Sequence, residues 1–212
     1  MQIYTIGHSN HDLQTFLNLL KQHEIQAIAD VRSHPYCKYT PHFTKKNIQT
    51  ELVNAKIKYV FLGEQLGARP TNPNCYRQGK VSFDELLKTE AFQTGIQRLL
   101  KGIKSYKVSL MCAEHDPISC HRSILICQHL SNLKVDIYHI KKDGSLESQS
   151  DLEQRLLVIH KLINNGLRQL DLFEQNFDAN NHDSYSSSSK LIKKVYRLQG
   201  DRIAHVNKKN KQ

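Results

Sequence analysis

Side chains that could carry out chemistry are densest in one short stretch of the sequence, residues 112–122. This stretch joins an apolar strand to a helix predicted to begin near Cys120. The N-terminus of a helix carries partial positive charge and unpaired N–H groups, which lower the pKa of a thiol, so Cys120 is the candidate nucleophile or redox thiol. Glu114 is the candidate general acid or base. Cys112 ends the strand and is a second catalytic candidate, with a small core residue as the alternative interpretation.

Basic residues near this stretch predict an anion-binding site. His121 and Arg122 follow Cys120 directly, and either positive charge would further favour its thiolate. Asp30 and Arg32 flank a single residue at another strand end, so their side chains point the same way. Two interpretations of this pair stay open: a salt bridge that shapes the loop, or Arg32 presented to a phosphate or carboxylate.

Two further loops contribute candidates. His8 and Ser9 follow Gly7 at a strand-to-helix turn. His8 is a secondary catalytic candidate, and Ser9 either contacts an anion or caps the following helix. Arg69 lies in the loop that leaves another predicted strand and is a further anion-binding candidate.

Metal and cofactor motifs do not emerge from the spacing of these residues. The chain has twelve histidines and five cysteines, but it has no Cys-x2-Cys pair and no His-x3-His motif on a helix. Cys112, Cys120 and His121 would meet a metal only with an unusual spacing, so no metal ligand is predicted and zinc is not expected. The loop with Gly63 and Gly67 matches neither a Walker A motif nor a dinucleotide fingerprint, which leaves any cofactor unknown.

The elements that must position these residues alternate between strands and helices. Five apolar, strand-like runs are separated by patterns of helical period, which predicts an open, mostly parallel five-stranded sheet with helices on both faces, a Rossmann-like three-layer α/β architecture. The predicted strands are Ile3–Ile6, Ala27–Val31, Lys58–Leu62, Val108–Met111 and Val135–Ile140.

Helix starts are predicted from capping residues. Ser9 or Asn10 would cap the first helix, and Thr44 would cap a second that runs to about Ala55. Ser82 with Glu85 predicts a capping box for one long third helix, and a fourth helix follows Cys120. A further helix is predicted over Asp151–Asn164, with Ser150 and Glu153 as its capping box.

The loops at the two ends of these strands differ sharply. Loops that lead into strands are short and contain none of the candidate residues, whereas loops that leave strands contain the candidate residues named above. Ligands of open parallel sheets bind beyond the carboxyl ends of the strands. We therefore expect one pocket there, with residues 112–122 on one wall and His8, Asp30 and Arg32 on the other.

Composition limits the class of protein. The first residues do not resemble a signal peptide, and no apolar run approaches the roughly 20 residues that span a bilayer, so we expect a cytoplasmic protein without membrane contact. The odd number of cysteines and their irregular spacing favour reduced thiols over a disulfide framework.

Charge and composition also divide the chain. We expect an α/β domain over residues 1–165, a flexible linker over 166–190, where Asn, Asp and Ser are frequent, and a basic tail over 191–212. The stretch 190–212 has eight Lys and Arg against one acid, or +7 of the net charge of +10. Such a tail either binds nucleic acid or another anionic surface, or simply keeps the chain soluble.

Four motifs in order give the chain a family resemblance. They are Thr5-Ile6-Gly7-His8-Ser9, Asp30-Val31-Arg32-Ser33-x-Pro35, Leu62-Gly63-x-x-Leu66-Gly67, and Met111-Cys112-Ala113-Glu114-x-x-Pro117-x-x-Cys120-His121-Arg122. Together they resemble the domain-of-unknown-function 488 family over residues 1 to about 145, and Tyr196–Ala204 is similar to the family's C-terminal stretch. The resemblance implies a bacterial-type α/β domain that is suspected to be an enzyme because of its paired cysteines, without a settled reaction.

A second, shorter resemblance lies in the segment 169–173. Gln169-Leu170-Asp171-Leu172-Phe173 is similar to the pentapeptide by which bacterial repair and replication proteins bind the sliding clamp. Leu172 and Phe173 would fill an apolar pocket, and Gln169 would form a hydrogen bond at a second subsite. The alternative is that these apolar residues pack back onto the domain.

The leading functional hypothesis is an enzyme that acts on a nucleotide or nucleic-acid substrate. A cysteine-dependent transferase, hydrolase or redox enzyme would fit the candidate thiol and the anion-binding arginines. The alternatives are a non-catalytic nucleic-acid-binding module and a DNA-repair accessory factor recruited by the sliding clamp.

Overall fold

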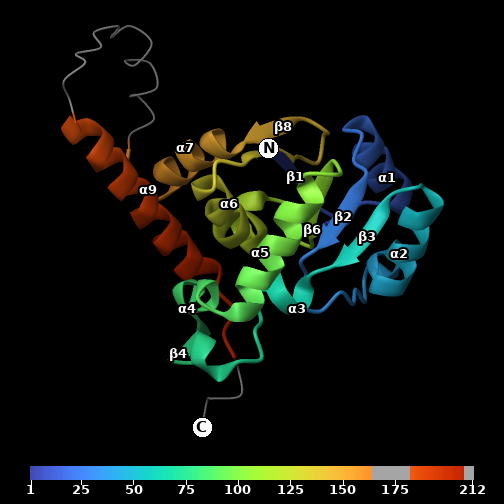
Figure 1. Cartoon of the computed structure of the whole chain (residues 1–212), viewed down its shortest axis with the longest axis horizontal. Coiled ribbons are helices and arrows are strands. Elements are labelled where there is room, and N and C mark those ends of the chain that lie inside the picture. Colours follow the sequence, from blue (N-terminus) through green and yellow to red (C-terminus); the bar gives the residue numbers. More distant parts are fainter. Residues whose placement is uncertain (164–181, 208–212) are drawn as a thin grey trace, which may run out of the picture.

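The computed structural model describes residues 1–163 and 182–207, and its main feature is a six-stranded sheet with the strand order β3-β2-β6-β1-β7-β8 (Figure 1). Neighbouring strands are parallel throughout, except that β8 is antiparallel to β7. The strands are β1 (Gln2–Gly7), β2 (Ala27–Asp30), β3 (Lys58–Phe61), β6 (Val108–Cys112), β7 (Asp136–Ile140) and β8 (Leu146–Ser148).

The five predicted strands are therefore confirmed, and the sheet has one strand more than predicted. β8 is a three-residue edge strand whose residues are exposed or half-buried, so it leaves no apolar run in the sequence. It is reached through a tight turn in which Gly144 has a φ of +82°, a conformation that favours glycine. β2 and β6 are buried along their whole length, as expected for central strands of a parallel sheet covered on both faces.

Helices cover both faces of the sheet, which makes the fold a three-layer α/β architecture. On one face, α1 (Leu13–Gln22) and α2 (Lys45–Asn54) pack against apolar side chains of β1 and β2. On the other face, the main covering elements are α5 (Glu90–Ile103), a π-helix called η4 (Arg122–Cys127) and α6 (Gln128–Asn132). The short helices are α3 (Gly63–Leu66), α4 (Phe83–Leu87), and the 3-10 turns η1 (Pro41–Phe43), η2 (Pro73–Cys75) and η3 (Pro117–Ser119).

Two of the predicted helix starts need correction, and one predicted helix is divided in two. Asp12, rather than Ser9 or Asn10, caps α1, because its carboxylate accepts the N–H of Thr15 at 2.7 Å. Thr44 does precede α2, as predicted.

The predicted long third helix is interrupted, and another helix starts earlier than predicted. Ser82 caps the short α4 as predicted, but Thr89 then accepts the N–H of Phe92 and starts α5. α7 (Gln149–Ile159) begins with Ser148 as its cap instead of Ser150, two residues before the predicted position. Several Ser and Thr residues compete as caps in these loops, and tertiary packing selects among them.

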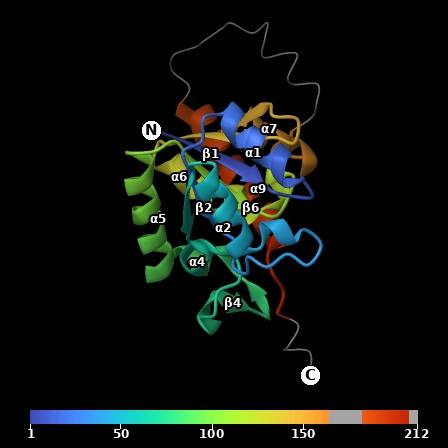
Figure 2. The same ribbon diagram turned by 90° about the vertical axis from the view of Figure 1, so that its right-hand side faces the viewer.

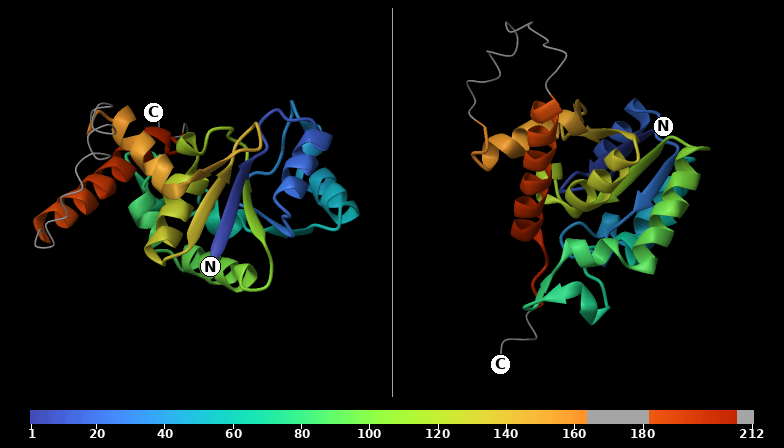
Figure 3. Two further views of the ribbon diagram at one scale, coloured as in Figure 1. Left: turned by 90° about the horizontal axis from the view of Figure 1, so that it is seen from above. Right: turned by 60° about the vertical axis from the view of Figure 1, so that its left-hand side comes forward.

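The C-terminal region forms a long helix, α9 (His182–Ile203), at the far side of the molecule from α2 (Figures 1 and 3). Val195 and Tyr196 are buried against α7, in a cluster with Leu152 and Leu156. The helix begins inside the segment predicted as a linker, and its apolar residues from Leu191 onward have the helical spacing that places them against α7. The part of the tail that the structure describes is therefore packed onto the α/β domain.

After α9 the chain turns back to a small antiparallel hairpin, β4 (Tyr76–Arg77) and β5 (Lys80–Val81). Figure 2 shows this hairpin beside the last described residues. Val81 N donates to the carbonyl of His205 at 2.9 Å, and Lys80 pairs with Val206. Through this contact, His205 and Val206 lie near the carboxyl ends of the sheet strands.

The segment 169–173, with Gln169, Leu172 and Phe173, lies outside the described residues. Within residues 1–163 and 182–207, no helix combines the length and the apolar character that a bilayer crossing requires.

Candidate active site

The loops that follow β1, β2 and β6 meet at one edge of the sheet, because these three strands are neighbours. The N–H of His8 donates to the carbonyl of Cys112 at 2.9 Å, and the N–H of Ser9 donates to Ala113 at the same distance. These bonds continue the strand pairing beyond the strands themselves. Candidate residues that are far apart in the sequence are therefore held next to one another at the carboxyl ends of the strands.

Cys120 is positioned by a capped turn. The carboxylate of Asp116 accepts the N–H of Ile118 at 3.1 Å, and Pro117 occupies the first position of η3. Cys120 is extended and stands directly before η4, where its sulfur accepts the N–H of Arg122 at 3.4 Å. The predicted helix start after Cys120 is confirmed, although the first part of the helix is a π-helix. The Cys120 side chain is 1% exposed.

Three side chains, those of Glu114, His121 and Cys112, lie around this sulfur. Cys120 Sγ lies 2.9 Å from Glu114 Oε2 and 3.9 Å from His121 Nδ1. Cys112 Sγ lies 3.7 Å from the same nitrogen. The other ring nitrogen of His121, Nε2, lies 3.1 Å from the carbonyl of Val31 in the loop after β2, which fixes the orientation of the ring.

The two cysteines of this cluster differ in their protonation. Burial raises the pKa of the Cys120 thiol, but a hydrogen bond with Cys112 and the charges of Arg122 and His121 outweigh burial, and the pKa lies well below the ordinary value. The pKa of Cys112 is raised well above the ordinary value, because Cys112 forms a hydrogen bond with Cys120 and is buried. Of the two thiols, Cys120 therefore ionises more readily than Cys112.

Glu114 stands between the Cys120 sulfur and solvent. Burial of the carboxyl group, and then the negative charge of Cys120, raise the pKa of Glu114. The residue as a whole is exposed and lines a cavity, while Oε2 contacts the buried Cys120 sulfur. Glu114 can thus exchange a proton both with Cys120 and with a molecule in the cavity.

Arg122 lies behind the cluster and is completely buried. Nη1 donates to the carbonyl of Glu114 at 2.7 Å, and Nη2 donates to the carbonyl of His115 at 3.3 Å. Nε donates to Thr5 Oγ1 at 3.3 Å. The guanidinium therefore holds the 112–122 loop in place and puts a positive charge next to Cys120, instead of facing the cavity.

Gly7 allows the loop to approach β1. A Cβ at this position would lie 1.9 Å from the carbonyl oxygen of Glu114 and 3.3 Å from Arg122 Nη1. Gly7→Ala should therefore displace the loop and lower the free energy of unfolding by about 1–3 kcal/mol or more, as overpacking does. Denaturant titration measures this change.

Gly102 provides a matched control for that substitution. It lies inside α5, and an added Cβ would come only within 4.0 Å of Val108. Gly102→Ala should be neutral or stabilise the chain by up to about 1 kcal/mol, because alanine favours the helix. Equal stability of Gly7→Ala and the wild type would contradict the close packing of Gly7 against the Glu114 loop.

Asp30 and Arg32 form the salt bridge that was one of the two interpretations of this pair. Arg32 Nε and Nη2 donate to the two carboxylate oxygens of Asp30 at 2.9 and 2.6 Å, and both side chains are buried. Arg32 Nη1 donates to the carbonyl of Phe43 at 2.8 Å, and Tyr59 donates its hydroxyl to Asp30 at 2.7 Å. Arg32 also lines the cavity, so it contributes to both the loop and the pocket.

His8 supports Arg32 from behind, outside the residues that line the cavity. Its Nε2 lies 3.1 Å from Arg32 Nη1 and 3.7 Å from Cys37 Sγ, and its ring stacks on Phe43 at 4.3 Å between centroids. Burial, and then the charge of Arg32, lower the pKa of His8 to about 4. His8 is thus a neutral imidazole that orients Arg32 near neutral pH.

The cavity above these groups has a volume of about 500 Å³. Its basic lining residues come from four separate parts of the chain, and Glu114 is the acidic residue among the described lining residues. Arg69 is exposed, and its guanidinium has no hydrogen-bond partner among the described residues. The basic lining residues are Arg32, His34, Arg69, His121 and His205.

Several lining residues were not among the candidates from the sequence. Ser33, His34 and Cys37 follow β2 in a loop whose position was predicted, so the strand-end rule could have included them. Ser119 precedes Cys120 and was predicted only as a helix start. His205 had no signal in the sequence, because it reaches the cavity only through α9 and the contact with β5.

Ser9 is a candidate that the structure separates from the cavity. It is half-buried with a φ of 47°, and its hydroxyl donates to the side chain of Asn10 at 3.3 Å. Gln169, Leu172 and Phe173 cannot be placed, because they lie outside the described residues.

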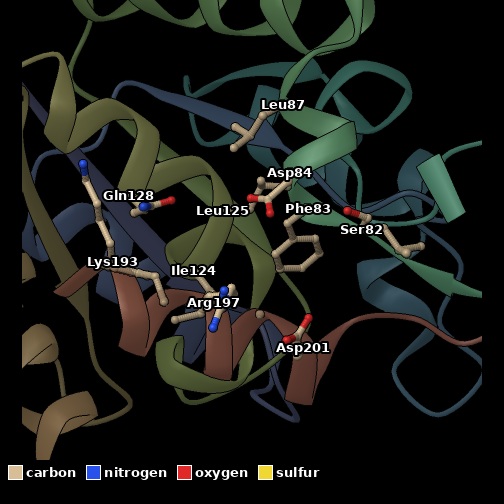
Figure 4. A pocket seen from close by; sticks show the side chains of 13 residues that line it. Ser82, Phe83, Asp84, Leu87, Ile124, Leu125, Gln128, Lys193, Arg197 and Asp201 are labelled. Atoms are coloured by element: carbon tan, nitrogen blue, oxygen red, sulfur yellow. The ribbon is translucent and has the colours of Figure 1, made fainter. Parts of the chain in front are cut away.

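A second cavity of about 310 Å³ lies between α4, η4 and α9 (Figure 4). Phe83 and Ile124 are among its apolar lining residues, and Asp84, Lys193 and Arg197 are among its charged ones. Among the described residues that line it, none is a cysteine or a histidine. The chemistry that the sequence predicted is therefore concentrated in the cavity beside Cys112.

Comparisons with known proteins identify a family and no individual relative. The family model described as "Domain of unknown function DUF488" matches residues 12–128, which is more than half of the chain. No curated protein and no solved structure matched the chain.

Proposed function

The chain belongs to the domain-of-unknown-function DUF488 family, and on that premise we propose that it is a thiol-dependent enzyme that acts on an anionic substrate of the nucleotide or nucleic-acid class. One observation carries the proposal. Cys120, a thiol with a lowered pKa, lies 2.9 Å from a carboxylate that also lines a basic cavity. A thiolate paired with a proton-transferring group in a cleft is the arrangement that nucleophilic catalysis needs.

Cys120 would attack an electrophilic atom of the substrate. The sulfur forms a bond to that atom, the bond to the leaving group breaks, and protonated Glu114 gives its proton to the leaving group. Glu114, now a carboxylate, then takes a proton from water or from an acceptor hydroxyl. That oxygen displaces the sulfur and restores the Cys120 thiolate. The cycle describes a hydrolase or a group transferase.

Access to Cys120 depends on Glu114. The sulfur is 1% exposed and lies beneath the cavity lining, whereas Glu114 is exposed and in contact with it. The Glu114 carboxylate lies against the Cys120 sulfur. Rotation of the Glu114 side chain away from Cys120 would therefore open a path from the cavity to the sulfur. The buried guanidinium of Arg122 stays behind Cys120 and stabilises the uncovered thiolate.

The cavity favours a substrate with phosphate groups. Its volume of about 500 Å³ lies within the range of roughly 300–1,000 Å³ that is usual for small-molecule sites. Arg69 offers an exposed guanidinium, which binds phosphate through two parallel hydrogen bonds. Arg32 has most of its donors engaged by Asp30 and Phe43, so it supplies positive charge more than new contacts.

The test is turnover of a panel of nucleoside phosphates and short single-stranded oligonucleotides by metal-free, reduced protein, followed by chromatography. We expect one substrate class to be converted. Arg69→Ala should raise KM with little change in kcat, whereas Arg98→Ala, whose side chain contacts Gln65, should change neither. Failure of the wild type to convert any compound of the panel would overturn the substrate class.

A non-catalytic function in nucleic-acid binding is the second candidate, and the charge of α9 favours it. Lys193, Lys194, Arg197 and Arg202 are exposed on this helix. If they contact a phosphate backbone, the affinity for oligonucleotides falls steeply with salt, and replacing Lys194 and Arg202 by glutamine reduces the salt dependence. Unchanged salt dependence in this variant would remove the proposal.

Recruitment by the bacterial sliding clamp stays a separate proposal for residues 169–173. It rests on the sequence of the pentapeptide. Pull-down of the clamp by the wild type, with loss of binding when Leu172 and Phe173 are both replaced by alanine, would support it. Equal binding by the double variant would contradict it.

A further inference from the structure

The cluster around Cys120 also has the geometry of a metal site. One ligand atom each from Cys112, Glu114, Cys120 and His121 lies within 4.8 Å of all the others. In tetrahedral zinc sites, Zn–S bonds of about 2.3 Å and Zn–N bonds of about 2.0–2.1 Å place a sulfur about 3.6 Å from a nitrogen ligand. The two sulfur–nitrogen distances in the cluster, 3.7 and 3.9 Å, are close to that separation.

His121 is oriented as a metal ligand would be. Its Nε2 faces the carbonyl of Val31 at 3.1 Å, so Nε2 carries the proton in the neutral ring and Nδ1 keeps its lone pair. Nδ1 points at both sulfurs. A hydrogen bond from the second ring nitrogen to a carbonyl is the usual support of a metal-binding histidine.

Charge balance adds an independent argument. Two thiolates and one carboxylate carry three negative charges, which a divalent cation and the buried guanidinium of Arg122 would neutralise. The N–H of Arg122 already donates to Cys120 Sγ at 3.4 Å. Thiolate and imidazole ligands select Zn²⁺ over Mg²⁺ or Ca²⁺, which prefer oxygen.

The cluster has an entry path as well. Cys112, Glu114 and His121 all line the cavity of about 500 Å³, so an ion from solvent meets three of the four groups at its floor. Cys120 lies directly beneath Glu114. The exposed Glu114 side chain can move to admit the ion and then serve as its outermost ligand.

We propose that Cys112, Cys120 and His121, with Glu114 as the fourth ligand, bind a single Zn²⁺ ion. Binding releases to solvent the protons that the two thiols and Glu114 still carry, while Nε2 of His121 keeps its proton. The bound ion occupies the electron pair with which Cys120 would attack a substrate, so the metal-bound form is inactive in the proposed reaction. The metal site goes beyond the proposed function. It uses some of the same side chains, but it would exist whether or not the protein catalyses the proposed reaction.

The sequence argued against a metal because of the ligand spacing. Cys112, Glu114, Cys120 and His121 are separated by two, six and one positions, which matches no Cys-x2-Cys or His-x3-His motif. The turn η3 folds the chain back between Glu114 and Cys120, and this brings the four groups together.

Co²⁺ is the probe for this site. The full chain is stripped of metal with a chelator under reducing conditions and titrated with Co²⁺. The wild type should develop the thiolate-to-cobalt charge-transfer absorption and the strong visible bands of a tetrahedral site, and Zn²⁺ should remove both. Cys112→Ser and His121→Gln each remove a direct ligand and should weaken binding by at least about 100-fold, because loss of an outer-shell partner alone costs about 10–100-fold.

Two further variants keep the test decisive. Glu114→Gln is an exposed substitution that should preserve the fold and still weaken Co²⁺ binding, whereas Cys75→Ala removes a buried thiol outside the cluster and should leave the spectrum unchanged. Absence of thiolate-to-cobalt absorption in the wild type, or its persistence in Cys112→Ser, would overturn the site. Turnover is measured with the chelator present, so failure of the proposed reaction would leave this result unaffected.

Discussion

Cys120→Ser is expected to lower the turnover of the cavity's substrate by about a thousandfold or more, because a serine hydroxyl is not ionised where the Cys120 thiolate is. Arg122 and His121 lower the pKa of the Cys120 thiol. The pKa of a serine hydroxyl is so much higher that the same charges would leave it protonated. KM should change little, since the basic residues that would hold the substrate are unaltered. Steady-state kinetics on metal-free protein measure both parameters.

Two other variants provide a control for that result and a second test of the mechanism. Cys75→Ala removes a buried thiol of the core that does not line the cavity, and it should retain wild-type turnover. Glu114→Gln keeps the shape of the side chain but cannot exchange a proton, so it should lower kcat and flatten its dependence on pH. Full activity of Cys120→Ser would remove Cys120 as the nucleophile.

Arg122→Ala is expected to lower the free energy of unfolding by about 3–5 kcal/mol, the cost of breaking a buried, charge-paired network. The substitution leaves the carbonyls of Glu114 and His115 without their buried donors and opens a cavity beside Thr5. Denaturant unfolding at neutral pH measures the loss.

Arg155 offers a contrast to Arg122. It forms salt bridges with Asp116 and Glu147, but its side chain is 37% exposed, so solvent screens the charges. Arg155→Ala should therefore cost about 0–1 kcal/mol. If the two alanine variants lost equal amounts of stability, the buried role of Arg122 would be wrong.

Much of the fold follows from local sequence patterns. β2 and β6 are short, continuous apolar runs, and the apolar residues of α1 and α5 recur at helical spacing, so these elements could be predicted. β8 and the division between α4 and α5 depend on pairing and packing with distant residues. A pattern confined to one segment carries no information about them.

The location of the candidate site was predictable from the sequence, but the contacts between its side chains were not. The carboxyl-end rule placed Asp30, Arg32 and Cys112 on one edge of the sheet, because it needs only the order of strands and loops. The burial of Arg122 and the contact between Cys120 and Glu114 arise from how η3 folds back on β6. The place of His205 depends on the docking of α9 and on the contact with β5, which no pattern within one segment shows.

The measurement that bears most directly on the proposed chemistry is a thiolate titration of the metal-free chain by ultraviolet absorbance. Because the pKa of Cys120 is lowered, the thiolate should persist as the pH falls through the range where ordinary thiols, with pKa values of about 8.5, are protonated. The difference between wild type and Cys120→Ser should therefore show one thiolate at pH values well below those at which ordinary thiols ionise. A difference that appears only above about pH 8 would contradict a thiolate on Cys120 and, with it, the proposed enzyme.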